Sequence, residues 1–149
     1  MKRIILGLVV LTSISAFASN PGIGTYSKYK ISGEAISGAY KIEIVDFNES
    51  LQKFTNRYTT EVNGSINVED EEFNTDEVNT REMNEMMLGH CEGLIGGKIE
   101  ELKVPAGSFT TCRLISEDGQ ITYLGSVPFG FVKIITKDGV IELTDYEYK

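Results

Sequence analysis

The sequence has no tryptophan, a single histidine and few basic residues, and each shortage excludes a class of function. A catalytic scheme based on histidine would have to use His90, whose neighbours at helical spacing include no carboxylate on the same face. No G-x-S-x-G nucleophile motif occurs. Lys and Arg number 14 against 22 Asp and Glu, so the acidic surface should repel nucleic acid. We therefore expect a protein that is not an enzyme, with no cofactor and no nucleic-acid partner.

Long apolar runs are also missing, apart from one near the start of the chain. Two basic residues precede an apolar segment, residues 4–14, which is too short to span a bilayer as a helix. Residues 16–18 then supply the small-x-small pattern of a cleavage site. We interpret residues 1–18 as a signal peptide, with a retained N-terminal anchor as the alternative. The mature protein, residues 19–149, is then periplasmic or secreted and not an integral membrane protein.

Removal of the signal peptide makes the protein still more acidic. It would leave 12 basic residues against 22 acidic ones, a formal net charge of -10. The acidic run of residues 69–72 could in principle collect calcium. It lacks the D-x-D-x-D-G spacing that places several oxygens around one ion, so we predict a solvated loop and no metal site.

Cysteine is scarce as well, since Cys91 and Cys112 are the two present. A pair without a C-x-x-C spacing or a set of histidines makes a poor zinc site. An even number of cysteines in an exported protein favours a disulfide instead. We predict that Cys91 and Cys112 are bonded to each other.

Alternating apolar and polar residues are typical of antiparallel strands, and they cover most of the mature chain. Turn signals such as Asn63-Gly64 and Pro105-Ala106-Gly107 separate the runs. The fold class predicted is α+β: one domain in which a strongly curved antiparallel sheet of about eight or nine strands, a half-barrel, packs on one helix. The expected strands are residues 25–32, 39–46, 53–62, 65–69, 98–104, 108–116, 120–125, 131–136 and 140–148.

One helix is expected where the apolar spacing changes to three and four residues. Asn74 or Thr75 should cap its N-terminus, and it should end between residues 89 and 93. We predict that one face of this helix lies against the sheet, either as a fixed part of the core or as a movable lid over a ligand. The residues whose spacing places them on that face are Met83, Met86, Met87, His90 and Cys91.

Apolar ligands are the ligand class that this composition favours. Methionine is flexible and polarisable, so a methionine-rich face can pack around varied apolar partners. Tyrosines on strands could line the mouth of a cavity. Ordinary core packing and cross-strand packing are the alternatives. The candidate ligand-binding residues are Met83, Met86, Met87, Tyr40 and Tyr58.

The order of motifs from the helix onward resembles a group of small exported bacterial β-rich proteins. Their shared pattern is a cysteine after a helix, a glycine-rich step, VPAGTF-x-x-C, and later P-x-G-x-V-K before the last hairpin. The matching residues here are Cys91, Gly96-Gly97, Val104–Cys112 and Pro128–Lys133. Such proteins resemble the lipoprotein-carrier fold of LolA and LolB, and the likeness covers about the last 70 residues. It implies an unclosed β-barrel around helical lid elements, with an apolar cavity for acyl chains.

Three functional classes remain open from the sequence, and the least favoured is an enzyme, because convergent titratable groups in a cleft cannot be assembled from these residues. The first is a non-catalytic periplasmic binding protein whose partner is a lipid, an acyl chain or another apolar small molecule. The second is a structural or protein-interaction component of the cell envelope that has no ligand cavity and whose partner is another envelope protein. A cavity between helix and sheet would favour the first.

Overall fold

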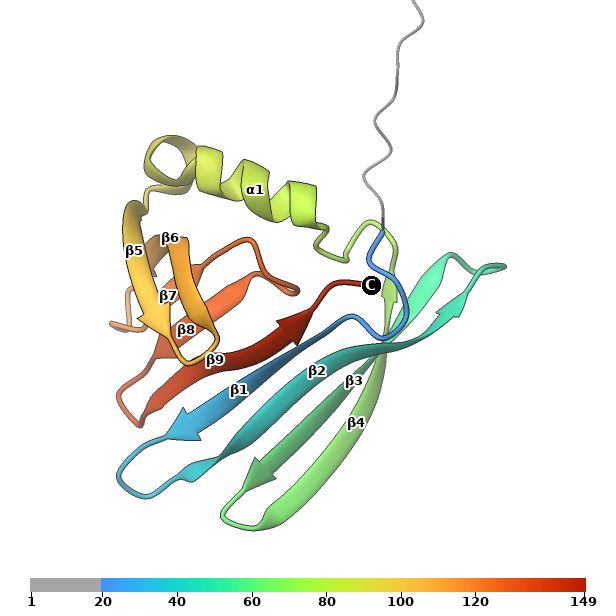
Figure 1. The fold of residues 1–149 in the computed structure, drawn as a ribbon, viewed down its shortest axis with the longest axis horizontal. Coiled ribbons are helices and arrows are strands. Elements are labelled where there is room, and N and C mark those ends of the chain that lie inside the picture. The colour runs from blue at the N-terminus through green and yellow to red at the C-terminus, as the bar shows by residue number, and fades with distance from the viewer. Residues whose placement is uncertain (1–19) are drawn as a thin grey trace, which may run out of the picture.

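The computed structural model describes residues 20–149, which form a single antiparallel sheet of nine strands with few helical residues (Figure 1). The prediction of one antiparallel sheet is confirmed. The predicted signal peptide and the start of the mature chain at Ser19 lie outside the described residues. The helical segments are α1 (Arg81–Gly89) and a short π-helical turn, η1 (Cys91–Ile95). The strands are β1 (Tyr26–Ser32), β2 (Ser37–Asn48), β3 (Lys53–Val62), β4 (Ser65–Asn74), β5 (Lys98–Val104), β6 (Gly107–Ile115), β7 (Ile121–Leu124), β8 (Phe131–Ile135) and β9 (Val140–Glu147).

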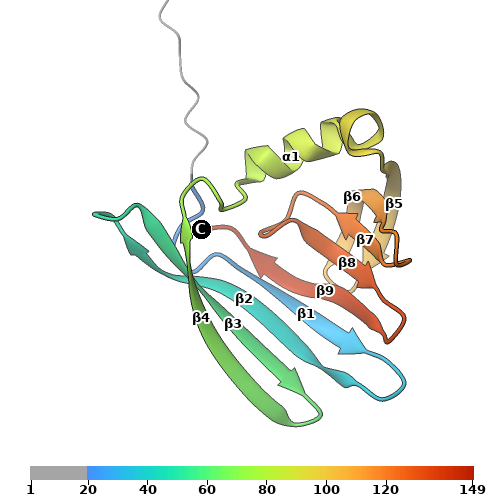
Figure 2. The same ribbon diagram turned by 180° about the vertical axis from the view of Figure 1, so that it is seen from behind.

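The strand order explains where the helix lies. The sheet runs β4-β3-β2-β1-β9-β8-β7-β6-β5, so it is open and its two edges are β4 and β5. Those edges are consecutive in the chain, and the segment that contains α1 and η1 carries the chain from one to the other (Figures 1 and 2). Every other connection joins neighbouring antiparallel strands, as short hairpin turns do.

The two faces of β1–β4 differ in character, because side chains alternate along each strand. Tyr29, Tyr40, Ile42 and Tyr58 share one face, which we call the tyrosine face. The opposite face carries ion pairs. Arg57 forms a bidentate pair with Asp70 of the neighbouring strand, with both N···O distances at 2.8 Å. The other ion pairs of these four strands are Lys28–Asp145, Lys41–Glu43 and Lys53–Glu72.

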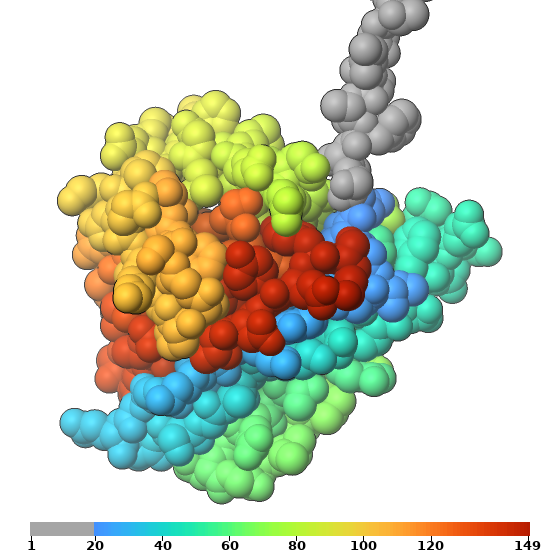
Figure 3. Space-filling model, viewed as in Figure 1, coloured from blue at the N-terminus to red at the C-terminus, as the bar shows by residue number. Residues whose placement is uncertain are grey.

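The main core lies where the β5–β6 hairpin folds back over β9. Leu143 of β9 and Val132 of β8 are fully buried, and Val104 at the end of β5 packs in the same cluster. The turn after Val104 is tied to β9, because the Ala106 amide donates to the Leu143 carbonyl at 3.2 Å. Figure 3 shows this hairpin packed directly against β9. A second cluster of Ile44, Phe54 and Val78 lies toward the other end of the sheet.

The segment between β4 and α1 differs from the prediction. The acidic run of residues 69–72 is not a loop but part of β4, where Asp70 and Glu72 are opposed by Arg57 and Lys53 of β3. Opposite charges across a strand pair favour pairing, so the strand continues to Asn74. Helix α1 therefore begins at Arg81 rather than after Asn74 or Thr75. Its N-cap is Thr80, whose hydroxyl accepts from the Met83 amide at 3.1 Å.

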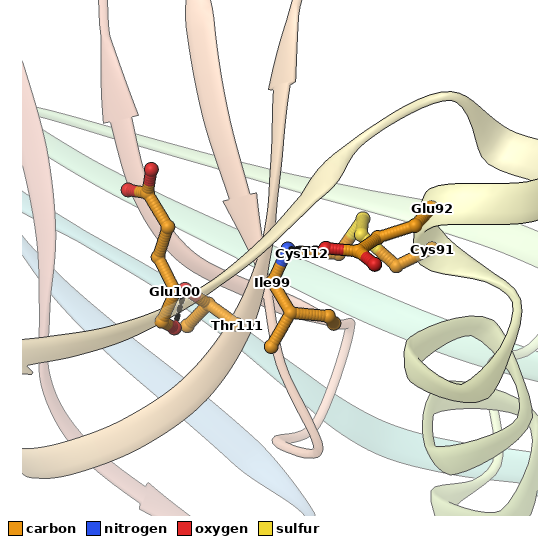
Figure 4. Close-up of a disulfide and its surroundings, with 6 residues drawn as sticks. All are labelled: Cys91, Glu92, Ile99, Glu100, Thr111 and Cys112. Carbon is orange, nitrogen blue, oxygen red and sulfur yellow. Dashed lines mark hydrogen bonds between the residues drawn. A yellow bond between two sulfur atoms is a disulfide. The ribbon is translucent and has the colours of Figure 1, made fainter.

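The predicted disulfide is confirmed. Cys91, the first residue of η1, is bonded to Cys112 in β6, and both are fully buried (Figure 4). The bond is surrounded by contacts between η1, β5 and β6: the Ile99 amide donates to Glu92, and the Thr111 hydroxyl donates to the Glu100 carbonyl. Gly97 is required beside it, since a Cβ there would lie 2.5 Å from the Cys112 sulfur.

Candidate functional site

The β7–β8 loop, residues 125–130, is held against the sheet and α1 by three side chains. Asn84 of α1 donates from Nδ2 to the Val127 carbonyl at 2.8 Å, and Ser27 of β1 donates from Oγ to the Pro128 carbonyl at 2.8 Å. All of these contacts are buried. The Tyr29 hydroxyl donates to the Phe131 carbonyl at 3.2 Å, just beyond the loop. The loop is therefore part of the core rather than a surface turn.

Phe129 occupies a backbone conformation that favours glycine. The Gly130 amide donates to the Val127 carbonyl at 2.9 Å and closes a turn in which Phe129, the third residue, has φ 63°. Such a conformation costs a bulky residue of order 1–2 kcal/mol relative to glycine. The ring packs against both core clusters, which offsets that cost. The chain keeps an aromatic ring at this place despite the strain.

Three apolar hollows meet at Phe131, the residue that follows the loop. The helix hollow, of about 550 Å³, lies between α1, η1 and the strands β6 and β7. The tyrosine hollow, of about 270 Å³, lies over β2 and β3. The strand hollow, of about 170 Å³, lies over β1, β8 and β9. Phe131 lines all three, and 37% of its surface is exposed. We call these three hollows, which share Phe131 as a lining residue, the apolar groove.

The groove walls are mainly aliphatic and aromatic, and their polar residues are Asn56, Glu77, Asn79, Ser116 and Thr122. Phe129 lines both the helix hollow and the tyrosine hollow, and Tyr40 and Ile42 line both the tyrosine hollow and the strand hollow. None of the described residues that line the three hollows is lysine or arginine. The remaining apolar lining residues are Met87, Ile95, Leu114, Ile115 and Leu124 in the helix hollow, Tyr58, Phe73 and Val78 in the tyrosine hollow, and Tyr29, Ile134 and Ile141 in the strand hollow.

Three tyrosines form a ladder along this groove. The ring centroids of Tyr29 and Tyr40 are 5.9 Å apart, and those of Tyr40 and Tyr58 are 6.3 Å apart with nearly parallel planes. Burial raises the pKa of Tyr40 to about 12, with smaller contributions from Tyr58 and Glu71. Burial also raises the pKa of Tyr58. Their hydroxyls therefore stay neutral at physiological pH, and the rings present uncharged faces.

One polar group in the tyrosine hollow is unusual. Asn56 of β3 lines the hollow and is only 5% exposed, yet its Oδ1 has no hydrogen-bond partner among the described residues. A buried acceptor without a donor costs about 1–3 kcal/mol. Such a group is a candidate contact for a ligand that carries a donor. The Oδ1 of Asn84 also lacks a partner, but that side chain is committed to the β7–β8 loop through its Nδ2.

The structure brings together some of the predicted binding residues and separates others. Tyr40 and Tyr58 lie side by side in the tyrosine hollow, and Met87 lines the helix hollow. Met83 is half-buried and lines none of the three hollows. Met86 is 59% exposed, so the prediction that it faces the sheet is wrong. Ligand binding by Tyr40, Tyr58 and Met87 stays a prediction.

The physical reason for this correction is an asparagine. The buried residue of α1 is Asn84, because the Val127 carbonyl needs a donor at that place. Thr80, Asn84 and Cys91 therefore form the buried side of this segment, and Met87 lies at its edge. Met86 lies on the other side of the helix and faces solvent. His90, which was also expected on the sheet-facing side, is exposed and is the C-cap of α1.

Replacing Met86 with alanine should therefore leave stability almost unchanged. Exposed side chains outside special features usually contribute within about 0.5 kcal/mol, whereas a buried methionine would contribute about 2–5 kcal/mol. The midpoint of urea unfolding for Met86→Ala, compared with wild type, measures the difference. A loss above about 2 kcal/mol would mean that Met86 packs in a core after all.

The groove residues that sequence reasoning missed are Phe129, Phe131 and Asn56. The segment Val127–Phe131 has an aromatic residue on each side of a glycine, but nothing in that pattern shows that the loop turns inward. Asn56 looks like any polar residue of an alternating strand. Its place in the hollow depends on β2, β3 and the β7–β8 loop, which together surround it.

Other features of the described residues do not suggest a different site. A hollow of about 530 Å³ lies between the β1–β2 and β8–β9 turns, but its lining includes Glu34, Lys137 and Asp138. Residues 20–149 contain no group of three or more His, Cys, Asp or Glu side chains that could hold a metal ion. None of the helices in this range is long and apolar enough to cross a membrane.

Comparisons with known proteins complete the description of the site. The chain was compared with models of protein families, with curated proteins and with solved structures. None of the three comparisons found a match, so the function has to be inferred from the chain's own residues.

Proposed function

We propose that this protein binds an apolar ligand, such as an acyl chain, in the apolar groove, and that it does so without catalysis. The observation that carries the proposal is the meeting of three apolar hollows at the partly exposed ring of Phe131. Ligand sites are mainly apolar depressions of roughly 300–1,000 Å³ with a few polar groups that fix orientation. The helix hollow is in this range, and Asn56 and the tyrosine hydroxyls supply the polar groups.

The same proposal includes the shape of the domain. We infer that the sheet acts as a half-barrel around the groove, with α1 and η1 along its rim. Support comes from the β5–β6 turn that bonds to β9 and from Met87 and Ile95, which line the helix hollow. The disulfide would keep the rim fixed at Cys91, since it joins the start of η1 to β6. In a lipoprotein-carrier-like fold this region would be the lid.

The alternative is a structural or protein-interaction role in the cell envelope. It would predict a continuous exposed apolar strip on the outside of the protein. The most exposed apolar side chains, Leu94, Ile66, Leu51 and Ile115, instead lie on η1, on β4, in the β2–β3 turn and on β6. Single exposed residues of this kind are normal, so the groove favours the binding role.

We also propose that the protein is periplasmic or secreted. Disulfides persist in oxidising compartments, and the bond between Cys91 and Cys112 fits that setting. The basic, apolar and small-x-small order of residues 1–18 supports the same location.

The binding test uses a charge placed in the groove. N-phenyl-naphthylamine, a neutral dye that brightens in apolar sites, should bind the wild-type protein. The affinity of the dye for the Phe131→Glu variant should be at least about tenfold lower than for the wild type. Dye binding there would remove the new carboxylate from water, which is unfavourable. The variant should still fold, since Phe131 is partly exposed. Dye titration gives the affinity, and circular dichroism checks the fold.

Leu94→Glu is the matched control. Leu94 is 83% exposed and lines none of the three hollows, so the same new charge there should leave dye affinity unchanged. If the wild type does not bind the dye, or if both variants bind it equally well, the proposed function is wrong. In that case the envelope-component role becomes the better description.

A further inference from the structure

Charge is distributed unevenly around the tyrosine hollow. Glu71 of β4 lies directly opposite Asn56 in the strand register, and Glu69 lies directly opposite Tyr58, so both carboxylates lie on the tyrosine face. Glu77 lines the hollow itself. The basic residues of the neighbouring strands, such as Arg57 and Lys41, lie on the opposite face of the sheet. The rim of this hollow is therefore acidic, with no lysine or arginine among its described lining residues.

The interior of the same hollow is aromatic. Tyr40 and Tyr58 form one wall, with their ring planes inclined by 20°, and Phe73, Phe129 and Phe131 also line it. Aromatic faces carry partial negative charge and attract cations within about 6 Å of the ring centroid. Elsewhere the protein already uses this attraction: the Arg81 guanidinium lies 4.5 Å from the Tyr148 ring centroid. No such contact to Tyr40 or Tyr58 occurs among the described residues.

The unpartnered oxygen of Asn56 points to the same class of ligand. Asn56 is 95% buried, and its Oδ1 needs a donor that residues 20–149 do not supply. An acyl carboxylate has no proton to donate at neutral pH and would meet Glu71 with like charge. An ammonium group can donate, or place its positive charge, toward Asn56, the tyrosine rings and Glu71 together. Charge, aromatic lining and the unpaired acceptor thus favour a positive group.

We infer that the tyrosine hollow binds the ammonium head of an amphiphilic ligand whose apolar tail lies along the groove past Phe131. This inference rests on the proposed function and specifies the ligand class: a long-chain amine whose ammonium head carries N–H donors, rather than a fatty acid. The aromatic and acidic surroundings select the charge of the head, and the helix and strand hollows accept the tail.

Isothermal titration calorimetry with three probes of equal tail length tests the inference on the unmodified protein. The probes are decylammonium, decanol and decanoate, each below its micelle concentration or solubility limit. The cation should bind about tenfold more tightly than the alcohol, as a desolvated cation–aromatic contact allows. Decanoate should bind more weakly than the alcohol because of the acidic rim.

Two variant pairs locate the preference. Glu71→Gln should reduce the cation's affinity several-fold toward that of decanol, whereas Glu72→Gln, with the same charge change on the opposite face of β4, should leave the preference intact. Tyr58→Leu should weaken cation binding more than Tyr58→Phe, which keeps the ring.

The outcomes separate the two proposals. If the three probes bind with equal affinity, the groove binds apolar tails and the cation inference is wrong while the proposed function stands. If Glu72→Gln lowers cation affinity as much as Glu71→Gln, the preference comes from the overall negative charge, and the inference is again wrong. If none of the probes binds, the proposed function fails as well.

Discussion

Cys112→Ser should destabilise the protein by about 3 kcal/mol, within the range of about 2–5 kcal/mol for removal of a native disulfide from a small secreted domain. The bond closes a loop with a sequence separation of 21 residues, and it is the sole link of its kind in the chain. Without it, the unfolded chain gains conformational freedom, and the segment from Cys91 to Gly97 is held to β6 by weaker contacts. Urea unfolding of variant and wild type measures the loss.

Reduction provides the control for this substitution. Wild-type protein in a reductant should unfold at nearly the same urea concentration as Cys91→Ser/Cys112→Ser, because both lack the cross-link. Thiol titration of unreduced wild type in denaturant should find no reactive thiols. Identical unfolding midpoints for the oxidised and the reduced protein would contradict a stabilising role for the bond.

Leu143→Ala should cost about 2–5 kcal/mol, the usual result of removing a buried leucine side chain. Leu143 is fully buried in the main core cluster, where β9, β1, the β5–β6 hairpin and the β7–β8 loop meet. A cavity at this junction loosens all four elements together. The expected result is a large downward shift of the urea midpoint, and the dye affinity of the folded fraction should fall too.

Leu51→Ala is the matched control, since Leu51 is 60% exposed in the turn between β2 and β3. The same atoms are removed there without leaving a cavity, and the expected change is within about 0.5 kcal/mol. Equal losses for the two variants would show that Leu143 is not at the centre of the core.

The strands were predictable because their signals are local. Alternation placed β3 at residues 53–62, as observed, and Asn63-Gly64 formed the expected hairpin turn with positive φ at both residues. The disulfide followed from the number of cysteines and from the expected export of the chain. Half-barrel curvature depends on how distant strands pack, and it stays a prediction.

The helix and the groove were harder to predict because competing or distant interactions decide them. Asn74 and Glu77 have the side chains of a helix start, and Glu77 does accept from the Asn74 amide at 2.8 Å. They form a single turn, however, because β4 extends to Asn74 and the helix starts at Arg81, after its N-cap Thr80. The burial of Asn84 could not be predicted, since its partner is a carbonyl 43 residues away. The groove likewise depends on the inward β7–β8 loop.

The acidic run in β4 has a consequence for how the protein behaves at high concentration. β4 is an edge strand, and its outer backbone groups could pair with another chain. Antiparallel pairing of two β4 strands would bring residues 69–72 of one molecule against the same four carboxylates of the next. That repulsion, added to the net charge, opposes growth of the sheet from molecule to molecule. The acidic run of residues 69–72, whose spacing does not suit a calcium loop, thus protects the open β-sheet from amyloid-like aggregation.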